Sequence, residues 1–239
     1  MSTPQFGPTT ASGVYSCHLL DVEANSTLES TIVWVGYQAG GTSNSDTPLI
    51  YASGCCGEYG APGFGPTWPP ANSGGGPVPL PLPSGATGAR ALSLDSGVAA
   101  VVGYAEFSNG GERAVEWSTT GVTLLPDVSG AASDESTAYA ANACEQIVGE
   151  SGQQFLTPGW GAPIATIWIN GVPHELAQML AQGAPTVTLT SARWINNSGE
   201  IGVIGFAAGM DASSTINEHE YLLIPTPTPP ASNDVSCAQ

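Results

Sequence analysis

Apolar and polar residues alternate along residues 191–206, and a polar cluster divides this stretch into two arms. The first arm ends at Ile195, the cluster is Asn196-Asn197-Ser198-Gly199, and the second arm ends at Phe206. Alternation with a period of two is typical of a half-buried β-strand, and Asn, Ser and Gly accept the backbone angles of a tight turn. The pattern therefore predicts a β-hairpin.

Earlier parts of the chain repeat this hairpin pattern. Residues 91–104 and residues 139–150 each contain a polar turn followed by an apolar arm. In each copy the second arm of the hairpin contains a glycine at the corresponding position: Gly103, Gly149 and Gly205. These glycines are roughly 50 residues apart, a spacing typical of propellers and other repeat arrays. The hairpin is therefore the core of a repeat.

Each repeat contains two further predicted strands. One begins after a glycine turn near residues 76, 121 and 171, and another follows the hairpin at residues 113–117, 165–168 and 219–223. Asn170-Gly171, which joins two of these strands, is a strong signal for a type I′ turn. The stretch from Ser12 to the first full repeat fits a degenerate further copy.

These patterns predict an all-β fold, a small β-propeller of four four-stranded blades, with five blades as the alternative. We expect one propeller domain over residues 1–224 and a Pro-rich tail over residues 225–239. The last blade ends without a fourth strand, so residues 12–17 are expected to pair beside residues 221–224 and close the ring.

Ring closure of this kind would bring Cys17 near the start of the C-terminal tail. The tail is long enough to fold back, so we expect a Cys17–Cys237 disulfide, which would close a very long loop. The pairing of the other cysteines, Cys55, Cys56 and Cys144, stays open.

Composition changes the picture of possible partners. The chain has 20 acidic residues against three arginines, no lysine, and a net charge of −17. This balance excludes nucleic acid and anionic membrane as partners, because both need a basic footprint. No apolar run has transmembrane length, so we expect no membrane insertion. A polar, lysine-free surface favours an extracellular or cell-surface protein whose leader peptide is absent from this chain.

Three segments of the chain form recognisable repeat motifs, namely Trp168-Ile169-Asn170-Gly171, the stretch 194–201 (WINNSGEI) and the ending 219–223 (HEYLL). They resemble the repeats of the HAF family of extracellular bacterial proteins. The resemblance covers residues 76–225 and implies an exported, β-propeller-like repeat protein. Where that family has His-Ala-Phe, this chain has Arg113-Ala114-Val115 and Ala165-Thr166-Ile167. The resemblance implies no activity, cofactor or catalytic residue.

Two short motifs come close to catalytic signatures. The stretch 174–178 (HELAQ) lacks the second histidine of the zinc motif H-E-x-x-H, because Gln178 stands in its place. The stretch 149–152 (GESG) lacks the last glycine of a nucleophile elbow. The first is interpreted as a turn-to-strand segment of a blade, and the second as a polar loop after a strand. The sequence predicts no metal site and no cofactor, and its catalytic residues stay unknown.

Carboxylates at predicted loops and strand ends could pair for hydrolysis or lyase chemistry, or bind Ca²⁺, but sequence alone does not fix their separation. The candidates are Asp127, Asp134, Glu135, Glu150, Asp211, Glu218 and Glu220.

The tryptophans are candidates for ligand contact or for packing. Trp117 and Trp168 occupy equivalent repeat positions and are expected to pack inside blades. Trp68 and Trp160 lie beside Pro and Gly in predicted loops and are the candidate ligand-binding residues. We therefore expect a secreted or cell-surface repeat module that binds a glycan, polymer or protein partner, or serves as a structural extracellular component. The alternative is an extracellular hydrolase or lyase that uses loop carboxylates at the propeller axis.

Overall fold

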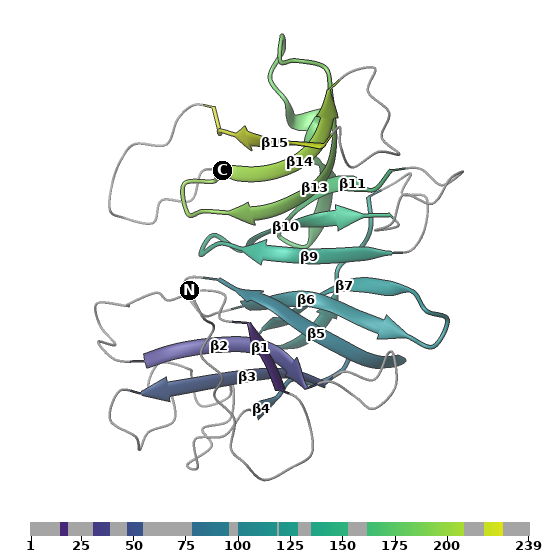
Figure 1. Ribbon diagram of the computed structural model, residues 1–239, viewed down its shortest axis with the longest axis vertical. Coiled ribbons are helices and arrows are strands. Elements are labelled where there is room, and N and C mark those ends of the chain that lie inside the picture. Colours follow the sequence, from purple (N-terminus) through teal and green to yellow (C-terminus); the bar gives the residue numbers. More distant parts are fainter. Residues whose placement is uncertain are drawn as a thin grey trace.

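The structure is a computed structural model of the full chain. It describes residues 80–95, 100–118, 120–128, 135–152, 162–207 and 218–226, together with the strand positions 15–18, 31–38, 47–54 and 78–79. Over these residues the fold is all-β, with strands β1 to β15 and one 3₁₀ turn (Figure 1).

The described strands form four antiparallel sheets that follow one another along the chain. The first contains β1 (Tyr15–His18), β2 (Thr31–Gln38), β3 (Thr47–Gly54) and β4 (Val78–Pro79). The second contains β5 (Ala86–Leu94), β6 (Ala100–Phe107), β7 (Glu112–Ser118) and β8 (Gly121–Leu124). The third contains β9 (Ser136–Ala141), β10 (Gln146–Ser151), β11 (Ile164–Ile169) and β12 (Val172–Glu175). The last contains β13 (Val187–Ile195), β14 (Ile201–Ala207) and β15 (Glu218–Leu223), and the 3₁₀ turn Leu176–Met179 precedes it.

Each sheet is a meander, with strands paired in chain order. The predicted hairpin at residues 191–206 is confirmed as β13 and β14, and a backbone hydrogen bond from Gly199 to Asn196 closes its turn. The turn between β11 and β12 has positive φ at both Asn170 (53°) and Gly171 (74°), as a type I′ turn requires. Turn chemistry therefore sets where these strands reverse.

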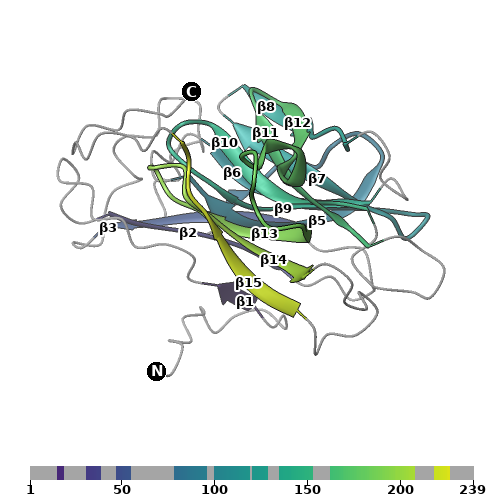
Figure 2. The same cartoon turned by 90° about the horizontal axis from the view of Figure 1, so that it is seen from above.

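Consecutive sheets pack face to face in chain order, so that the first and last sheets lie at opposite ends of the stack (Figure 1). The leading strand β9 contacts the leading strands of both neighbouring sheets, β5 and β13. Figure 2 views the stack from above, with the last sheet nearest the reader. The arrangement resembles successive blades, although the described residues do not form a closed ring.

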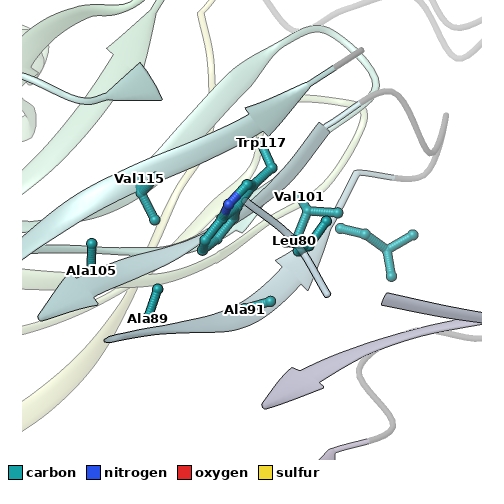
Figure 3. Packing of buried hydrophobic residues seen from close by; sticks show 8 residues of the cluster. Leu80, Ala89, Ala91, Val101, Ala105, Val115 and Trp117 are labelled. Carbon is teal, nitrogen blue, oxygen red and sulfur yellow. The ribbon is translucent and has the colours of Figure 1, made fainter. Parts of the chain in front are cut away.

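The buried core divides into clusters at these sheet faces. In the second sheet, Trp117 is fully buried among small and β-branched side chains such as Val101, Val115 and Ala91, with Leu80 beside them (Figure 3). A second cluster joins the second sheet to the third and includes Val102 and Trp168. A third cluster joins the third sheet to the last. Burial of apolar area at each joint stabilises the stack.

The repeated glycines have a common steric cause. A Cβ placed on Gly103 would lie 1.9 Å from the carbonyl oxygen of Arg90, and one on Gly149 would lie 1.9 Å from that of Thr137. A Cβ on Gly205 would likewise lie 2.4 Å from the carbonyl oxygen of Thr188. Each contact occurs where the leading strand of the sheet is bulged, so the glycine allows that strand to approach closely.

Within the described residues the last sheet has three strands. The strand expected to fill the fourth place does not do so. β1, which contains Tyr15 and Cys17, pairs with β2 in the first sheet, and β15 is hydrogen-bonded to β14 alone among the described strands. The predicted pairing of residues 12–17 beside residues 221–224 is therefore wrong for this part of the chain. β2 begins thirteen residues after β1 and offers it a nearer antiparallel partner than the far C-terminal strand.

Within the described residues, no helix has the length and apolar character needed to cross a bilayer.

Candidate functional site

The structure reaches only some of the residues that the sequence singles out. Trp68, Trp160 and Cys237 lie outside the described residues. Cys17 lies in β1 at the position opposite Gly36. Cys144, in the turn between β9 and β10, is disulfide-bonded.

The motif at residues 174–178 is divided between a strand and a turn. His174 and Glu175 end β12, and Gln178 lies in the 3₁₀ turn, where its side-chain nitrogen donates a 2.7 Å hydrogen bond to Glu175. No group of three or more His, Cys, Asp or Glu side chains in the described residues is placed to hold a metal ion.

The motif at residues 149–152 lies at the end of β10, not in the loop that the sequence suggested. Ser151 is fully buried, and its hydroxyl accepts a 3.1 Å hydrogen bond from the hydroxyl of Thr166. The backbone N–H of Val128 also points to this hydroxyl, at 3.4 Å. Ser151 therefore links strands β10 and β11 to the segment after β8, and its buried hydroxyl takes part in structural hydrogen bonds.

The candidate carboxylates separate into four groups. Asp134 and Asp211 lie outside the described residues. Asp127 approaches the guanidinium of Arg113 at 3.6 Å, between the second sheet and the segment that follows it. Glu218 and Glu220 are exposed on β15. The remaining pair, Glu135 and Glu150, belongs to an acidic cluster between the second and third sheets.

This acidic cluster is centred on Glu112, the first residue of β7. Burial, and after it the charge of Glu106, raise the pKa of Glu112 to about 6, with smaller contributions from Glu135 and Glu150 and an opposing one from Arg90. Arg90 approaches Glu106 at 3.8 Å, and its guanidinium lies 5.7 Å from the ring centre of Tyr104. The cluster therefore brings the pKa of one carboxyl, that of Glu112, closer to neutral pH.

A second polar contact joins the third sheet to the last through Glu150. The Tyr139 hydroxyl donates a 3.0 Å hydrogen bond to Glu150, and Arg193 approaches the same carboxylate at 3.8 Å. The guanidinium of Arg193 lies 4.0 Å from the ring centre of Tyr139, which is within cation–π range. Burial raises the pKa of Glu150, and the side chains of Ser191, Arg193 and Tyr139 oppose that shift.

Backbone irregularity brings Tyr139 and Arg193 together. Each residue is skipped in the strand register, at a bulge in β9 and a bulge in β13 respectively. A bulged residue points its side chain away from the regular alternation. Both side chains therefore reach the joint between two sheets.

The outer face of the last sheet carries a different feature, an exposed apolar row. Trp194 on β13, Gly202 on β14 and Leu222 on β15 are consecutive cross-strand partners, and we call them the Trp194 row. The indole of Trp194 lies over Gly202, where it fills the space that a Cβ would occupy. Trp194 is 46% exposed and Leu222 is 52% exposed.

Comparison with the preceding sheet shows why this face differs. Val148 and its partner Ile167 in the third sheet are buried against the last sheet. Ile204 and its partner Glu220 occupy the corresponding places in the last sheet, where Ile204 is half-buried and Glu220 is exposed. The described residues contain no further sheet that covers this row.

Sequence reasoning missed the central residues of both features. Glu112 and Glu106 lie in strands whose sequence pattern is that of ordinary blade positions. Only the charges around Glu112, two of which come from the third sheet, distinguish them. Trp194 was visible as part of the repeat, but alternation alone does not tell a covered face from an exposed one.

Comparison with known protein families finds no match to the chain, and comparison with curated proteins finds none either. Among solved structures, the crystal structure of TolB from Acinetobacter baumannii is similar over 81% of this chain, with 13% sequence identity and a TM-score of 0.42. The similarity covers 38% of that protein, so this chain spans well under half of its length. At this TM-score the likeness carries no inference about function.

Proposed function

We propose that this chain is a secreted or cell-surface binding module that contacts a protein partner through the Trp194 row. The observation that carries the proposal is the exposure of Trp194 and Leu222 on a face whose counterpart in the preceding sheet is buried. Exposed apolar groups that lie together are typical of interaction sites, and Trp is enriched among residues that dominate binding energy.

A protein fits this row better than a glycan. Sugar recognition needs hydrogen-bonding groups around an aromatic ring, and the neighbours of Trp194 along the row, Gly202 and Leu222, offer apolar surface instead. Ile224, just beyond β15, is 55% exposed and extends the apolar character at this end. An aliphatic and aromatic surface of this kind favours burial against a protein.

The extracellular location is supported by composition and by one cysteine. A chain without lysine and with a disulfide-bonded Cys144 fits an oxidising compartment better than a reducing one. A closed four-bladed ring is the alternative to this proposal, because in such a ring the first sheet would cover the Trp194 row and no partner protein could bind there.

The test compares two pairs of exposed apolar residues in the intact chain. Immobilised wild type should retain a partner protein from the extracellular fraction of its source, and the variant Trp194→Ala/Leu222→Ser should not. The purified partner should bind this variant at least about tenfold more weakly than it binds wild type. The matched control Val172→Ser/Met179→Ser removes apolar area of similar exposure on the third sheet and on the 3₁₀ turn, and should leave binding unchanged.

Two results would contradict the proposal. One is equal retention of the partner by both variants. The other is protection of a Trp194→Cys thiol from maleimide in the isolated protein, which would mean that the first sheet closes over the row.

A second candidate function, an extracellular hydrolase or lyase, is favoured by one observation. The pKa of Glu112 is raised to about 6 among three other carboxylates, and a proton donor of this kind serves acid–base catalysis. Turnover of aryl glycosides or uronate polymers that disappears in Glu112→Gln and persists in Glu116→Gln would support it. Glu116 is a suitable control because burial also raises its pKa.

A further inference from the structure

We propose that the outer edge of β15 binds an extended basic segment of a partner protein as a fourth strand. This inference rests on the proposed protein-binding function and names the class of partner. In the described residues, the first three sheets have four strands each and the last has three. An unpaired edge offers a row of backbone donors and acceptors to another extended chain.

The register of the missing strand follows from the sheets that possess one. β8 places Thr123 opposite Glu116 and Gly121 opposite Ser118. β12 places His174 opposite Ile167 and Val172 opposite Ile169. In the last sheet Glu220 and Leu222 hold the places of Ile167 and Ile169, because the repeated glycines Gly149 and Gly205 align the two sheets. An incoming antiparallel strand would therefore meet Leu222 first, Tyr221 second, Glu220 third and His219 fourth.

Exposure in the existing fourth strands shows which side chains face outward. Thr123 in β8 and His174 in β12, at the third position, are exposed. Their neighbours Val122 and Pro173, at the second position, are half-buried. Odd positions of the incoming strand therefore face solvent beside the Trp194 row, and even positions face the joint with the third sheet.

The side chains along β15 define what the odd positions should be. The first faces Leu222 and favours an apolar residue. The third faces Glu220 and the fifth faces Glu218, both exposed carboxylates, so Lys or Arg is favoured at each. The preferred segment is an apolar residue followed by basic residues two and four positions later, with β-branched residues between them.

Charge excludes this chain itself as the source of that segment. Its three basic residues are Arg90, Arg113 and Arg193, which lie in β5, β7 and β13, and each has a carboxylate partner there. The segments 1–14 and 227–239 contain neither Lys nor Arg. The same holds for a second copy of the chain. The basic strand must therefore come from a different protein.

The test uses short synthetic peptides, capped at both ends, with the intact protein. The matching peptide carries Leu-Val-Lys-Val-Lys in its centre. A second peptide has Glu in place of both Lys, and a third moves both Lys one position along, onto the opposite face. We expect the first to bind and to shift the amide resonances of residues 218–224, and the other two to bind on the order of tenfold more weakly by calorimetry.

A charge exchange sharpens the result. In Glu218→Lys/Glu220→Lys the preference should reverse, so that the Glu peptide binds more tightly than the Lys peptide. The proposal is overturned if no peptide binds, if the preference does not reverse, or if the shifted amides lie away from β15. If Trp194→Ala/Leu222→Ser loses a protein partner but no peptide binds, the proposed function is retained and the added strand is rejected. If a peptide binds at β15 but that variant retains its partners, the added strand is retained and the proposed function is rejected.

Discussion

The indole nitrogen of Trp168 donates a 2.7 Å hydrogen bond to the carbonyl oxygen of Pro126, in the segment that leads from β8 toward the third sheet. Trp117 makes the equivalent bond, also 2.7 Å, to the carbonyl oxygen of Pro81 after β4. Both indoles are fully buried. These two bonds thus join the second and third sheets, each to the segment that enters it from the sheet before, which accounts for the packing role expected of these two residues.

Replacement of Trp168 by Phe should therefore destabilise the protein considerably. The change removes the indole donor and leaves a void in a close-packed cluster, which together should lower the free energy of unfolding by about 2–3 kcal/mol. Trp117→Phe should have a similar effect because its geometry is the same. Trp194→Phe, on the exposed face, should change stability by less than about 0.5 kcal/mol. Urea denaturation of the three variants would check this order, and a Trp194 variant as unstable as the other two would contradict it.

The close approach at Gly149 leads to a second prediction. Gly149→Ala would place a Cβ against the backbone carbonyl of Thr137, which can move only if β9 moves. We expect a loss of about 2–4 kcal/mol in unfolding free energy.

Gly202→Ala is the matched control for this substitution. The three atoms nearest to its new Cβ would all belong to the indole of Trp194, a partly exposed side chain that can rotate into solvent. Thermal unfolding should therefore show a much smaller loss for Gly202→Ala than for Gly149→Ala. Equal losses would mean that the carbonyl contact is not the reason for the repeated glycine.

The strand repeats could be predicted from sequence because their causes are local. The turn at Asn170-Gly171 and the hairpin at Asn196–Gly199 need particular backbone angles within a few residues, and the alternation beside them sets strand length. The place of β1 could not be predicted in this way. Its choice between β2 and β15 depends on chain distance and on packing, and Ser12–Cys17 resembles other edge strands by composition alone.

The acidic cluster was only partly predictable for a similar reason. Glu135 and Glu150 were candidates because they end strands, whereas Glu112 and Glu106 belong to β7 and β6 and become significant only through the stacking of sheets. A pKa depends on neighbours that are distant in sequence, and periodicity contains no information about them.

The contact between Arg193 and Tyr139 predicts energetic coupling between the third sheet and the last. In a double-mutant cycle, Arg193→Gln and Tyr139→Phe should each destabilise the protein, and the double variant should lose less than the sum of the two. We expect a coupling energy of about 0.5–2 kcal/mol, because the guanidinium lies over the ring and both groups reach Glu150. Strict additivity in chemical denaturation would show that the two side chains do not interact in solution.

The raised pKa of Glu112 predicts a specific pH dependence of stability. In the unfolded chain this carboxyl has a pKa near 4.5, and in the folded protein it has a pKa of about 6. Between these values the folded state binds the proton more tightly than the unfolded state, so the contribution of Glu112 to unfolding free energy falls as pH rises through this range. Because the side chain is only partly buried, we expect the effect to be on the order of 1 kcal/mol after solvent screening.

The measurement is the difference in unfolding free energy between wild type and Glu112→Gln, followed by urea denaturation from below pH 4.5 to above pH 7. Other carboxylates titrate in both proteins, so their contribution cancels in this difference. Glu112→Gln should become more stable relative to wild type as pH rises, since the amide avoids the buried charge near Glu106 and Glu150. A flat difference for Glu112→Gln would mean that Glu112 is not surrounded by the other carboxylates in solution.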